Sequence, residues 1–213
     1  IPLGIFAGLK PKSKVSKTIM AGSILGFSMP TFWVGIIFIM IFAVHLGWLP
    51  STGRGELGTF LGIQSSLFTA NGLSHVFLPA LNLALFKMSS VIRLTRAGTR
   101  EIILQDYITF ARSKGLSEEK VVLVHVLRNI LIPIVTVIGL EFGSLIAFST
   151  VTETIFAWPG MGKLIIDSIY NLDRPVIVAY LMIIVTFFVF LNLLVDILYS
   201  LLDPRVRVKG ANE

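Results

Sequence analysis

The 213-residue sequence contains no cysteine, and only 14% of its residues are charged. Without cysteine the chain forms no disulfide and offers neither a thiol nucleophile nor the ligands of a cysteine-type zinc or iron–sulfur site. Histidine is scarce too, since His45, His75 and His125 are the whole complement and no two of them are four residues apart. We therefore expect no metal site and no histidine that acts as a general base.

The shortage of charge is matched by an excess of apolar residues. Hydrophobic residues make up 54% of the chain, the mean hydropathy is +0.85, and sixteen phenylalanines stand against four tyrosines. Several near-uncharged stretches reach roughly 20 residues, the length that crosses a bilayer. The composition predicts a multi-pass membrane protein. The net charge of +6 then favours basic loops that face anionic lipid over a nucleic-acid site.

The apolar stretches predict an all-α fold, a polytopic bundle of transmembrane helices that forms one domain over residues 1–213. We expect Pro30 to kink the first span, since proline removes a backbone hydrogen bond in mid-helix. The apolar residues up to Leu9 have the pattern of the tail of a further span. The four complete spans are expected over about 19–44, 76–94, 130–151 and 176–201.

Small residues four apart occur at Gly22/Gly26 and at Gly139/Gly143. This spacing lets helix backbones approach closely in lipid. The alternative interpretation is the ordinary glycine richness of transmembrane helices.

Positive charge is divided unevenly between alternate connections. Fourteen lysines and arginines fall in the connection 10–17, in the stretch 93–128 and in the C-terminal tail, which holds Arg205, Arg207 and Lys209. Only three fall in the intervening connections, namely Arg54, Lys163 and Arg174. Cytoplasmic loops of membrane proteins carry the excess of Lys and Arg. We therefore expect the stretch 93–128 and the C-terminus to be cytoplasmic.

The segment 107–129 is the most informative part of that basic side. Its pattern predicts two helices with a break, because Gly115 permits the turn and Ser117 can cap the helix that follows. Glu118 and the glutamate after it then stand in the first helical turn, where the helix dipole favours acids. Residues 121–127 are almost wholly apolar, so this helix needs the bundle, the bilayer surface or a protein partner to bury it.

These motifs resemble those of binding-protein-dependent ABC importer permeases, in the dipeptide and oligopeptide branch. The family's coupling motif has Glu-Ala-Ala and, four residues on, a glycine. Ala111 and Gly115 match its last two positions, whereas Thr109 and Phe110 replace the first two. The likeness continues in chain order through Pro30-Thr-Phe-Trp-Val-Gly35, Leu46-Gly-Trp-Leu-Pro50, Leu78-Pro-Ala-Leu81, Arg93-Leu-Thr-Arg96, Asp106-Tyr-Ile, His125-Val-Leu-Arg-Asn129 with Pro133, Glu153-Thr-Ile-Phe-Ala-Trp-Pro-Gly-Met-Gly162, Asn192-Leu-Leu-Val-Asp196 and Leu202-Asp-Pro-Arg205.

The resemblance implies a permease subunit that forms half of the pathway for ATP-driven import of dipeptides, oligopeptides or related small solutes. Members of the family are longer, so we expect the chain to be the C-terminal part of a longer one. The expected location is the bacterial cytoplasmic (inner) membrane.

The resemblance also implies partners: a second homologous permease subunit, two ATP-binding subunits, an extracytoplasmic solute-binding protein and membrane lipid. The chain itself would bind no cofactor and would not be an enzyme, because ATP and Mg would be used by the partner subunits. The residues implied in docking on the ATPase are Ala111, Gly115, Leu116, Ser117 and Glu118. Those implied in packing the second helix against the bundle are His125, Arg128 and Asn129.

Three ionisable residues, Lys87, Glu141 and Asp196, fall inside predicted spans. Such groups are expensive at that depth and usually line a cavity or pair with one another. Lys87 and Glu141 are therefore candidates for lining the pathway, with structural pairing as the alternative. For Asp196 a structural pairing with Arg205 or Arg207 is favoured.

On the sparsely charged side, residues 164–170 have helical periodicity and follow a Trp-Pro-Gly-Met turn. We expect a short helix at the outer face, with Trp158, Pro159, Gly160 and Met161 shaping the mouth that receives substrate. The alternative is a loop that only covers the bundle.

Two other function classes remain as alternatives. An ion-driven secondary transporter would explain Lys87 and Glu141 but would leave the segment 107–129 without a purpose. An intramembrane enzyme would need a nucleophile and a base at matching depth, and the sequence has no such arrangement.

Overall fold

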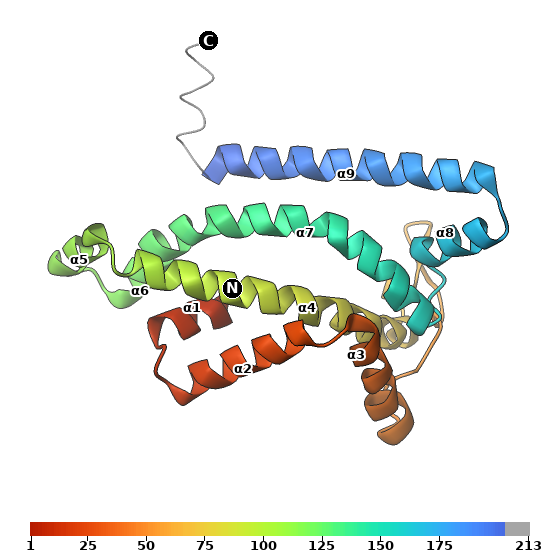
Figure 1. Ribbon diagram of the computed structural model, residues 1–213, viewed down its shortest axis with the longest axis horizontal. Helices are drawn as coiled ribbons and strands as arrows, with labels where there is room; N and C mark the ends of the chain where they lie inside the picture. Colours follow the sequence, from red (N-terminus) through yellow and green to blue (C-terminus); the bar gives the residue numbers. More distant parts are fainter. Residues whose placement is uncertain (203–213) are drawn as a thin grey trace, which may run out of the picture. The chain divides into compact units, whose positions relative to one another are not determined.

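The computed structural model describes residues 1–202, whose regular elements are helices apart from one short hairpin (Figure 1). The tail with Arg205, Arg207 and Lys209, and the end of the Leu202-Asp-Pro-Arg205 segment, lie outside the described residues. The elements are α1 (Pro2–Leu9), α2 (Lys14–Ser28), α3 (Thr31–Phe38), the π-helical segment η1 (Ile39–His45), β1 (Gly58–Phe60), β2 (Ile63–Ser65), the 3-10 turn η2 (Ser66–Phe68), α4 (Ala70–Ile102), α5 (Asp106–Ser113), α6 (Glu118–Lys120), the π-helical segment η3 (Val121–Val126), α7 (Leu127–Ile155), α8 (Met161–Tyr170) and α9 (Arg174–Leu202).

Three helices in the described part are long and apolar enough to cross a membrane, judged by length and composition. They are Ala70–Ile102, Glu118–Ile155 and Arg174–Leu198. The bent pair Lys14–Ser28 and Thr31–His45 would add a fourth if it is one broken span, and is otherwise a re-entrant loop. The second, third and fourth spans expected from the sequence fall within α4, α7 and α9.

Pro30 breaks the first expected span, where we expected only a kink. α2 ends at Ser28, and α3 begins at Thr31 with Pro30 as its N-cap in an extended conformation (φ −60°, ψ 135°). Proline lacks the N–H that would continue α2, and its ring clashes with the carbonyl one turn back. The same residue is well suited to precede a new helix, so one helix stops and another begins.

The chain divides into two compact units, and α4, α7 and α9 each contribute to both. The first unit contains Ile1–Gly26, Met88–Phe142 and the chain from Phe187 on. The second contains Phe27–Lys87 and Gly143–Thr186.

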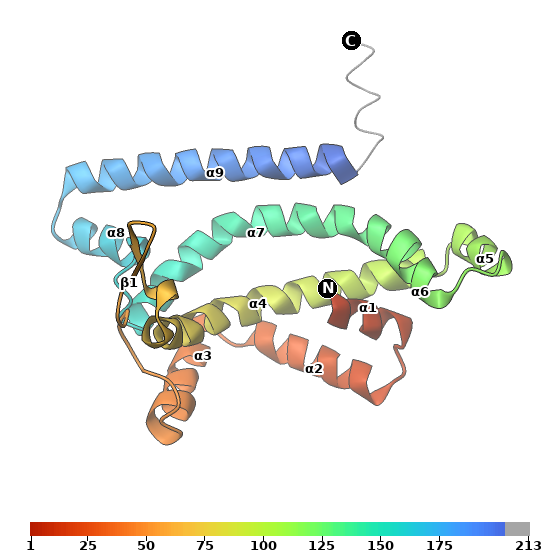
Figure 2. The same cartoon turned by 180° about the vertical axis from the view of Figure 1, so that it is seen from behind.

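In the first unit, α1 packs tightly against α4, and Figures 1 and 2 both show the two helices side by side. A Cβ on Gly4 would lie 2.5 Å from Cβ of Thr95, and one on Gly8 would lie 2.6 Å from Cβ of Thr99. Both threonines are fully buried, and their hydroxyls donate to carbonyls one turn earlier in α4. The glycines therefore allow backbone approach at a distance that any side chain would prevent.

The two glycine pairs expected from the sequence behave differently from each other. A Cβ on Gly139 would lie 2.8 Å from the Val195 side chain of α9, so this position does support close helix packing. A Cβ on Gly22 would meet no atom within 4 Å. For Gly22, ordinary glycine richness is the better interpretation within this chain.

The second unit contains the β1–β2 hairpin, an element that the sequence analysis did not anticipate. The strands are antiparallel, with Gly58 opposite Ser65 and Phe60 opposite Ile63. Leu61 and Gly62, which join them, both have positive φ (50° and 81°), as a type I′ hairpin turn requires. Asn82 and Thr152, both buried, are hydrogen-bonded to each other and tie α4 to α7 in this unit.

Candidate functional site

The turn between α5 and α6, which we call the α5 turn (residues 106–120), has the break expected from the sequence. Gly115 has φ +78°, in the left-handed region that glycine alone adopts freely. Its N–H donates to the carbonyl of Arg112, and the next N–H, of Leu116, donates to the carbonyl of Ala111. Ser117 occupies the N-cap position of α6 with extended backbone angles, but its side chain makes no capping hydrogen bond. Backbone bonds and Gly115 therefore close the turn, without the cap that we expected.

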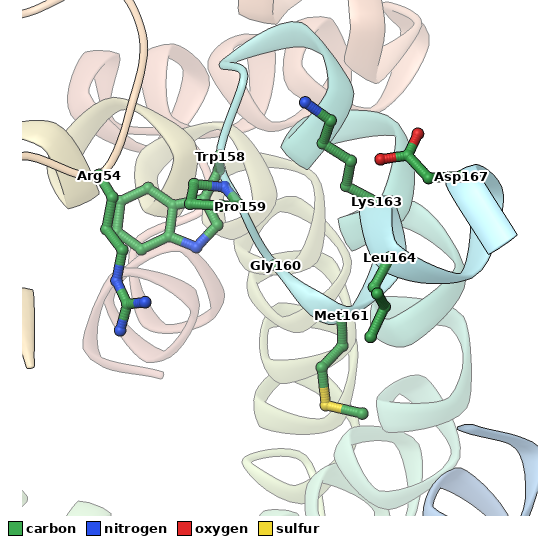
Figure 3. Close-up of a pocket in the computed structure, with 8 residues that line it drawn as sticks. All are labelled: Arg54, Trp158, Pro159, Gly160, Met161, Lys163, Leu164 and Asp167. Atoms are coloured by element: carbon green, nitrogen blue, oxygen red, sulfur yellow. The ribbon is translucent and has the colours of Figure 1, made fainter. Parts of the chain in front are cut away.

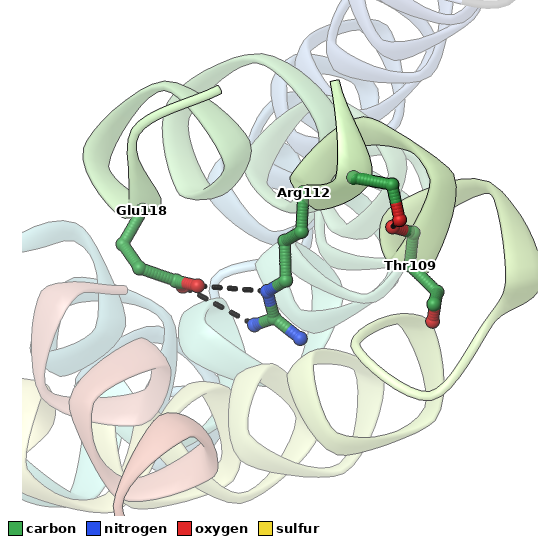
Figure 4. Close-up of polar contacts among 4 residues, drawn as sticks. Thr109, Arg112 and Glu118 are labelled. Carbon is green, nitrogen blue, oxygen red and sulfur yellow. Dashed lines mark hydrogen bonds and ion pairs between the residues drawn. The ribbon is translucent and has the colours of Figure 1, made fainter. Parts of the chain in front are cut away.

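An ion pair spans the α5 turn. Nε of Arg112 donates to Oε1 of Glu118 at 2.7 Å, and the neighbouring N–H donates to Oε2 at 3.2 Å (Figure 4). The side chains are 39% and 66% exposed. Sequence reasoning named Glu118 but missed Arg112, because the two are six residues apart with a turn between them and follow no helical spacing. Glu118 thus has a partner within its own chain.

A cluster of buried apolar residues joins α5 to the helix that follows the turn. Its fully or nearly buried members are Ile108, Ala111, Val121, Val126, Ile130 and Ile134. Part of the run 121–127 is therefore buried by the chain itself, whereas Leu123 and Val124 stay 55% and 48% exposed. In the same unit, Leu104 is 80% exposed and Phe110 is 61% exposed. The turn thus combines a buried base with an exposed apolar surface.

Arg128 and Asn129, which we expected to pack the second helix against the bundle, are exposed in this chain, and their packing role stays a prediction. Val121, Val126 and Ile130, which belong to the buried cluster, pack this helix within the chain. His125 is half-buried and its ring contacts Tyr107 edge-on, while the amide of Asn129 donates to the Tyr107 hydroxyl at 3.3 Å. Desolvation raises the pKa of the Tyr107 phenol above its ordinary value of 10.0.

The helix that begins at Glu118, after the α5 turn, continues into the next span without a break. α6, η3 and α7 follow one another directly and act as one helix, Glu118–Ile155. We placed the coupling segment at about 107–129 and the next span at about 130–151, and the helix runs without interruption across that boundary. Because the helix is continuous, a displacement of the α5 turn would be transmitted along its axis into the span.

The loop between α7 and α8, together with α8, forms the second candidate site, which we call the α8 loop (residues 153–170). The expected short helix is present and begins earlier than predicted, at Met161. The Glu153 carboxylate accepts a hydrogen bond from the N–H of Lys163 at 2.8 Å. A Cβ on Gly160 would lie 2.4 Å from that carboxyl group, and one on Gly162 would lie 2.6 Å from the Cα of Thr150. Glycine is needed at position 162, because the loop there lies against the backbone of α7, whereas the carboxyl group near Gly160 is the end of a flexible side chain.

The α8 loop borders a cavity of about 590 Å³ within the second unit (Figure 3). The four expected mouth residues, Trp158, Pro159, Gly160 and Met161, all line it. Sequence reasoning missed the charged members, since they come from different segments. The remaining lining residues are Arg54, Lys163, Leu164 and Asp167.

The ionisable residues inside the helices occupy different settings. Lys87 is half-buried; its ammonium group donates to the Ser144 hydroxyl and lies 5.4 and 5.6 Å from the ring centres of Phe86 and Phe148. Glu141 is half-buried in the first unit, and Asp196 is exposed in this chain. The expected partners of Asp196, Arg205 and Arg207, lie outside the described residues. A pathway role for Lys87 and Glu141 stays a prediction.

Residues 1–208 match the family described as "Binding-protein-dependent transport system inner membrane component". The chain is 42% identical to the di/tripeptide transport system permease protein DppB of Pseudomonas aeruginosa, covering 96% of this chain and 64% of that protein. It is 38% identical to the dipeptide transport system permease protein DppB of Escherichia coli K12 (98% and 66%). It is 41% identical to the oligopeptide transport system permease protein AppB of Bacillus subtilis (97% and 64%).

The chain spans about two-thirds of the length of these relatives or slightly less. The match nevertheless includes every described helix, both candidate sites and almost the whole sequence. The chain therefore belongs to the family of binding-protein-dependent transport system inner membrane components, which are multi-pass helical permeases.

Proposed function

We propose that this chain forms half of the membrane pathway of an ABC importer for dipeptides, oligopeptides or related small solutes. One observation carries the proposal: relatives at about 40% identity over nearly all of this chain are named as permeases of di/tripeptide, dipeptide and oligopeptide transport systems. A relative named for glutathione transport, 38% identical, supports keeping related small solutes within the proposal.

The proposed assembly contains a second homologous permease subunit, two ATP-binding subunits and an extracytoplasmic solute-binding protein. This chain contributes position and movement and binds no cofactor of its own, whereas ATP and Mg are used by the ATP-binding subunits. The uneven distribution of Lys and Arg supports placing the α5 turn on the cytoplasmic side and the α8 loop outside.

We propose the α5 turn as the part that docks on an ATP-binding subunit. The exposed apolar residues in it and just beside it, Leu104, Phe110 and Leu123, offer a surface that a protein groove would cover. Of the expected docking residues, Gly115, Ser117 and Glu118 are exposed, whereas Leu116 packs against the buried cluster and Ala111 belongs to it. The continuous helix from Glu118 to Ile155 would carry the movement into the membrane.

Replacement of Gly115 by valine tests this assignment. A Cβ at Gly115 would meet no atom within 4 Å, so the variant acts through the positive φ and not through a clash. A β-branched residue resists that φ at a cost of roughly 1–2 kcal/mol, which changes the shape of the turn. We expect normal membrane insertion, loss of co-purified ATP-binding subunits and loss of transport-linked ATP hydrolysis.

Gly47→Val is the matched control, because Gly47 also has positive φ (63°) and open space around it but lies in the second unit. It should keep the ATP-binding subunits bound. If Gly115→Val assembles and transports at the normal rate, the coupling assignment is wrong. Uptake into vesicles driven by a proton gradient without ATP would instead support the ion-driven alternative.

A further inference from the structure

A second cavity of the second unit, which we call the break cavity, lies where α2 ends and α3 begins. Its volume is about 420 Å³, and it is lined by the chain from Phe27 to Phe32 together with side chains of α4 and α7. Pro30 and Phe86, which both line it, fall near the middle of two expected spans, about 19–44 and 76–94. The break cavity therefore lies within the depth of the bilayer.

Three phenylalanines from α2, α4 and α7 form one wall of the break cavity. The rings of Phe27 and Phe86 are stacked with their centres 5.1 Å apart, and the rings of Phe86 and Phe148 are tilted with their centres 5.8 Å apart. Phe32 lines the same cavity. Phe27, Phe32 and Phe148 remain exposed in this chain, so the wall is open to a ligand.

The ammonium group of Lys87 lies against this aromatic wall. It is 5.4 Å from the ring centre of Phe86 and 5.6 Å from that of Phe148, and it donates a hydrogen bond to the Ser144 hydroxyl. Cation–π attraction therefore holds the two rings in place. A positive charge already set against the rings repels a second cation, and it does so strongly where the dielectric is low. The wall thus suits a neutral apolar group and disfavours a cationic one.

The helix break adds polar backbone to the break cavity. Thr31 and Phe32, the first residues of α3, both line it, and within residues 1–202 neither N–H group donates a hydrogen bond. Pro30, the N-cap of α3, makes no side-chain capping bond. Unbonded backbone groups are costly in hydrocarbon, and irregular backbone at this depth lines a water-filled cavity or is covered by protein. A lipid acyl chain therefore suits the cavity poorly, whereas a peptide brings both apolar side chains and polar oxygen atoms.

We propose that the break cavity binds a neutral apolar side chain of a transported short peptide. Phe27, Phe86 and Phe148 contact that side chain, and Lys87 acts as a positioning residue that holds two of the rings and excludes cationic side chains. The volume of about 420 Å³ lies within the range of small-molecule pockets, about 300–1,000 Å³. The inference rests on the transport function proposed above, and it names the part of the substrate that the permease itself selects.

A photoreactive dipeptide, alanyl-p-benzoylphenylalanine, tests the proposal. Benzophenone inserts readily into methionine side chains, and Met29 lines the break cavity. The permease assembled with its ATP-binding subunits in nanodiscs is illuminated with the probe, and the label is mapped by mass spectrometry. We expect the label on Met29. Met40 and Met182, which are exposed and do not line the cavity, are the controls and should stay unlabelled.

Competition identifies the group that the cavity binds. Alanyl-phenylalanine should prevent the labelling of Met29 at a concentration about tenfold lower than dialanine, because it buries a larger apolar side chain. Alanyl-lysine should compete no better than dialanine. Phe86→Ala should abolish the advantage of alanyl-phenylalanine, whereas Phe77→Ala, an exposed position of the same helix outside the cavity lining, should keep it. Lys87→Gln should improve competition by alanyl-lysine about tenfold, and Lys87→Arg should restore the exclusion.

Labelling of Met29 that alanyl-phenylalanine does not prevent would indicate a groove for lipid acyl chains and would overturn the proposal. Labelling only at other residues, or no labelling, would overturn it as well, and neither result depends on a variant that has to fold. Failure of the transport function would be seen separately, as absence of ATP-dependent uptake of alanyl-phenylalanine by the unsubstituted transporter.

Discussion

The α5 turn and the α8 loop each reverse the chain between helices, and each contains a glutamate, but the two glutamates do different work. Glu118 is exposed and pairs with Arg112 across a turn that an apolar cluster already holds. Glu153 is partly buried, and its carboxylate accepts a hydrogen bond from the backbone N–H of Lys163. This loop lies close to α7 at Gly160 and Gly162. We infer that a charged side chain stabilises the fold more when it is buried and when few other contacts hold its segment.

Cysteine labelling from each side of the membrane would test whether the two regions lie on opposite sides, and the expected effect is all or none. We expect Ser117→Cys, in the α5 turn, to react only from the cytoplasm. Leu61→Cys, at the hairpin tip and 87% exposed, should react only from outside. Gly55 is a poor probe because a Cβ there would lie 2.6 Å from the side chains of Asn71 and His75. Both labels on one side would overturn the proposed orientation.

Truncation of Ile108 should produce the largest loss of local stability, because this fully buried side chain joins α5 to the apolar cluster. We expect Ile108→Ala to cost about 2–5 kcal/mol and to increase hydrogen exchange across α5. Phe110→Ala, two residues away and 61% exposed, is the control and should change exchange little. Equal effects of the two would mean that the cluster does not hold the turn.

Gly162→Ala tests the close approach in the α8 loop. The added Cβ would lie 2.6 Å from the Cα of Thr150, a backbone atom that cannot rotate away. We expect a cost of about 1–3 kcal/mol, measured as a lower midpoint of thermal unfolding in detergent. Gly22→Ala, which meets no atom within 4 Å, should leave the midpoint unchanged or raise it. A tolerated Gly162→Ala would show that the loop lies farther from α7.

Glu153→Gln keeps an acceptor for the N–H of Lys163 but removes its charge. Bonds to charged groups stabilise more than bonds between neutral groups, so we expect a loss of about 1 kcal/mol. Hydrogen exchange at the amide of Lys163 should rise by about fivefold. An unchanged exchange rate would mean that the charge of Glu153 does not stabilise this loop.

Glu118→Gln should have the smallest effect on stability. The pair with Arg112 is exposed, and exposed pairs contribute about 0–1 kcal/mol and are screened by salt. We expect the difference from the unsubstituted protein to vanish in 1 M salt, as measured by exchange in the α5 turn. A large, salt-independent loss would mean that Glu118 is buried in the assembled protein.

The positions of most helices could be predicted from the sequence, because the thickness of the bilayer sets the length of a span and charged residues are rare inside it. The positions of the helices that contain the second, third and fourth spans, the glycine turn at residue 115 and the short helix before Asn171 all follow from local composition. Local rules also misled in places. Pro30 breaks a helix where a kink was expected, and Ser117 makes no capping hydrogen bond where a cap was expected.

Sequence alone predicted a multi-pass helical membrane protein of this family, since the length of apolar runs and the order of motifs can be read along the chain. Only the tertiary structure decided which distant residues meet. Gly4 and Gly8 face Thr95 and Thr99, and Arg54 shares a cavity with Lys163 and Asp167. These pairings depend on helix rotation and loop path, which the energy of the whole packed chain sets and which no short stretch of sequence encodes.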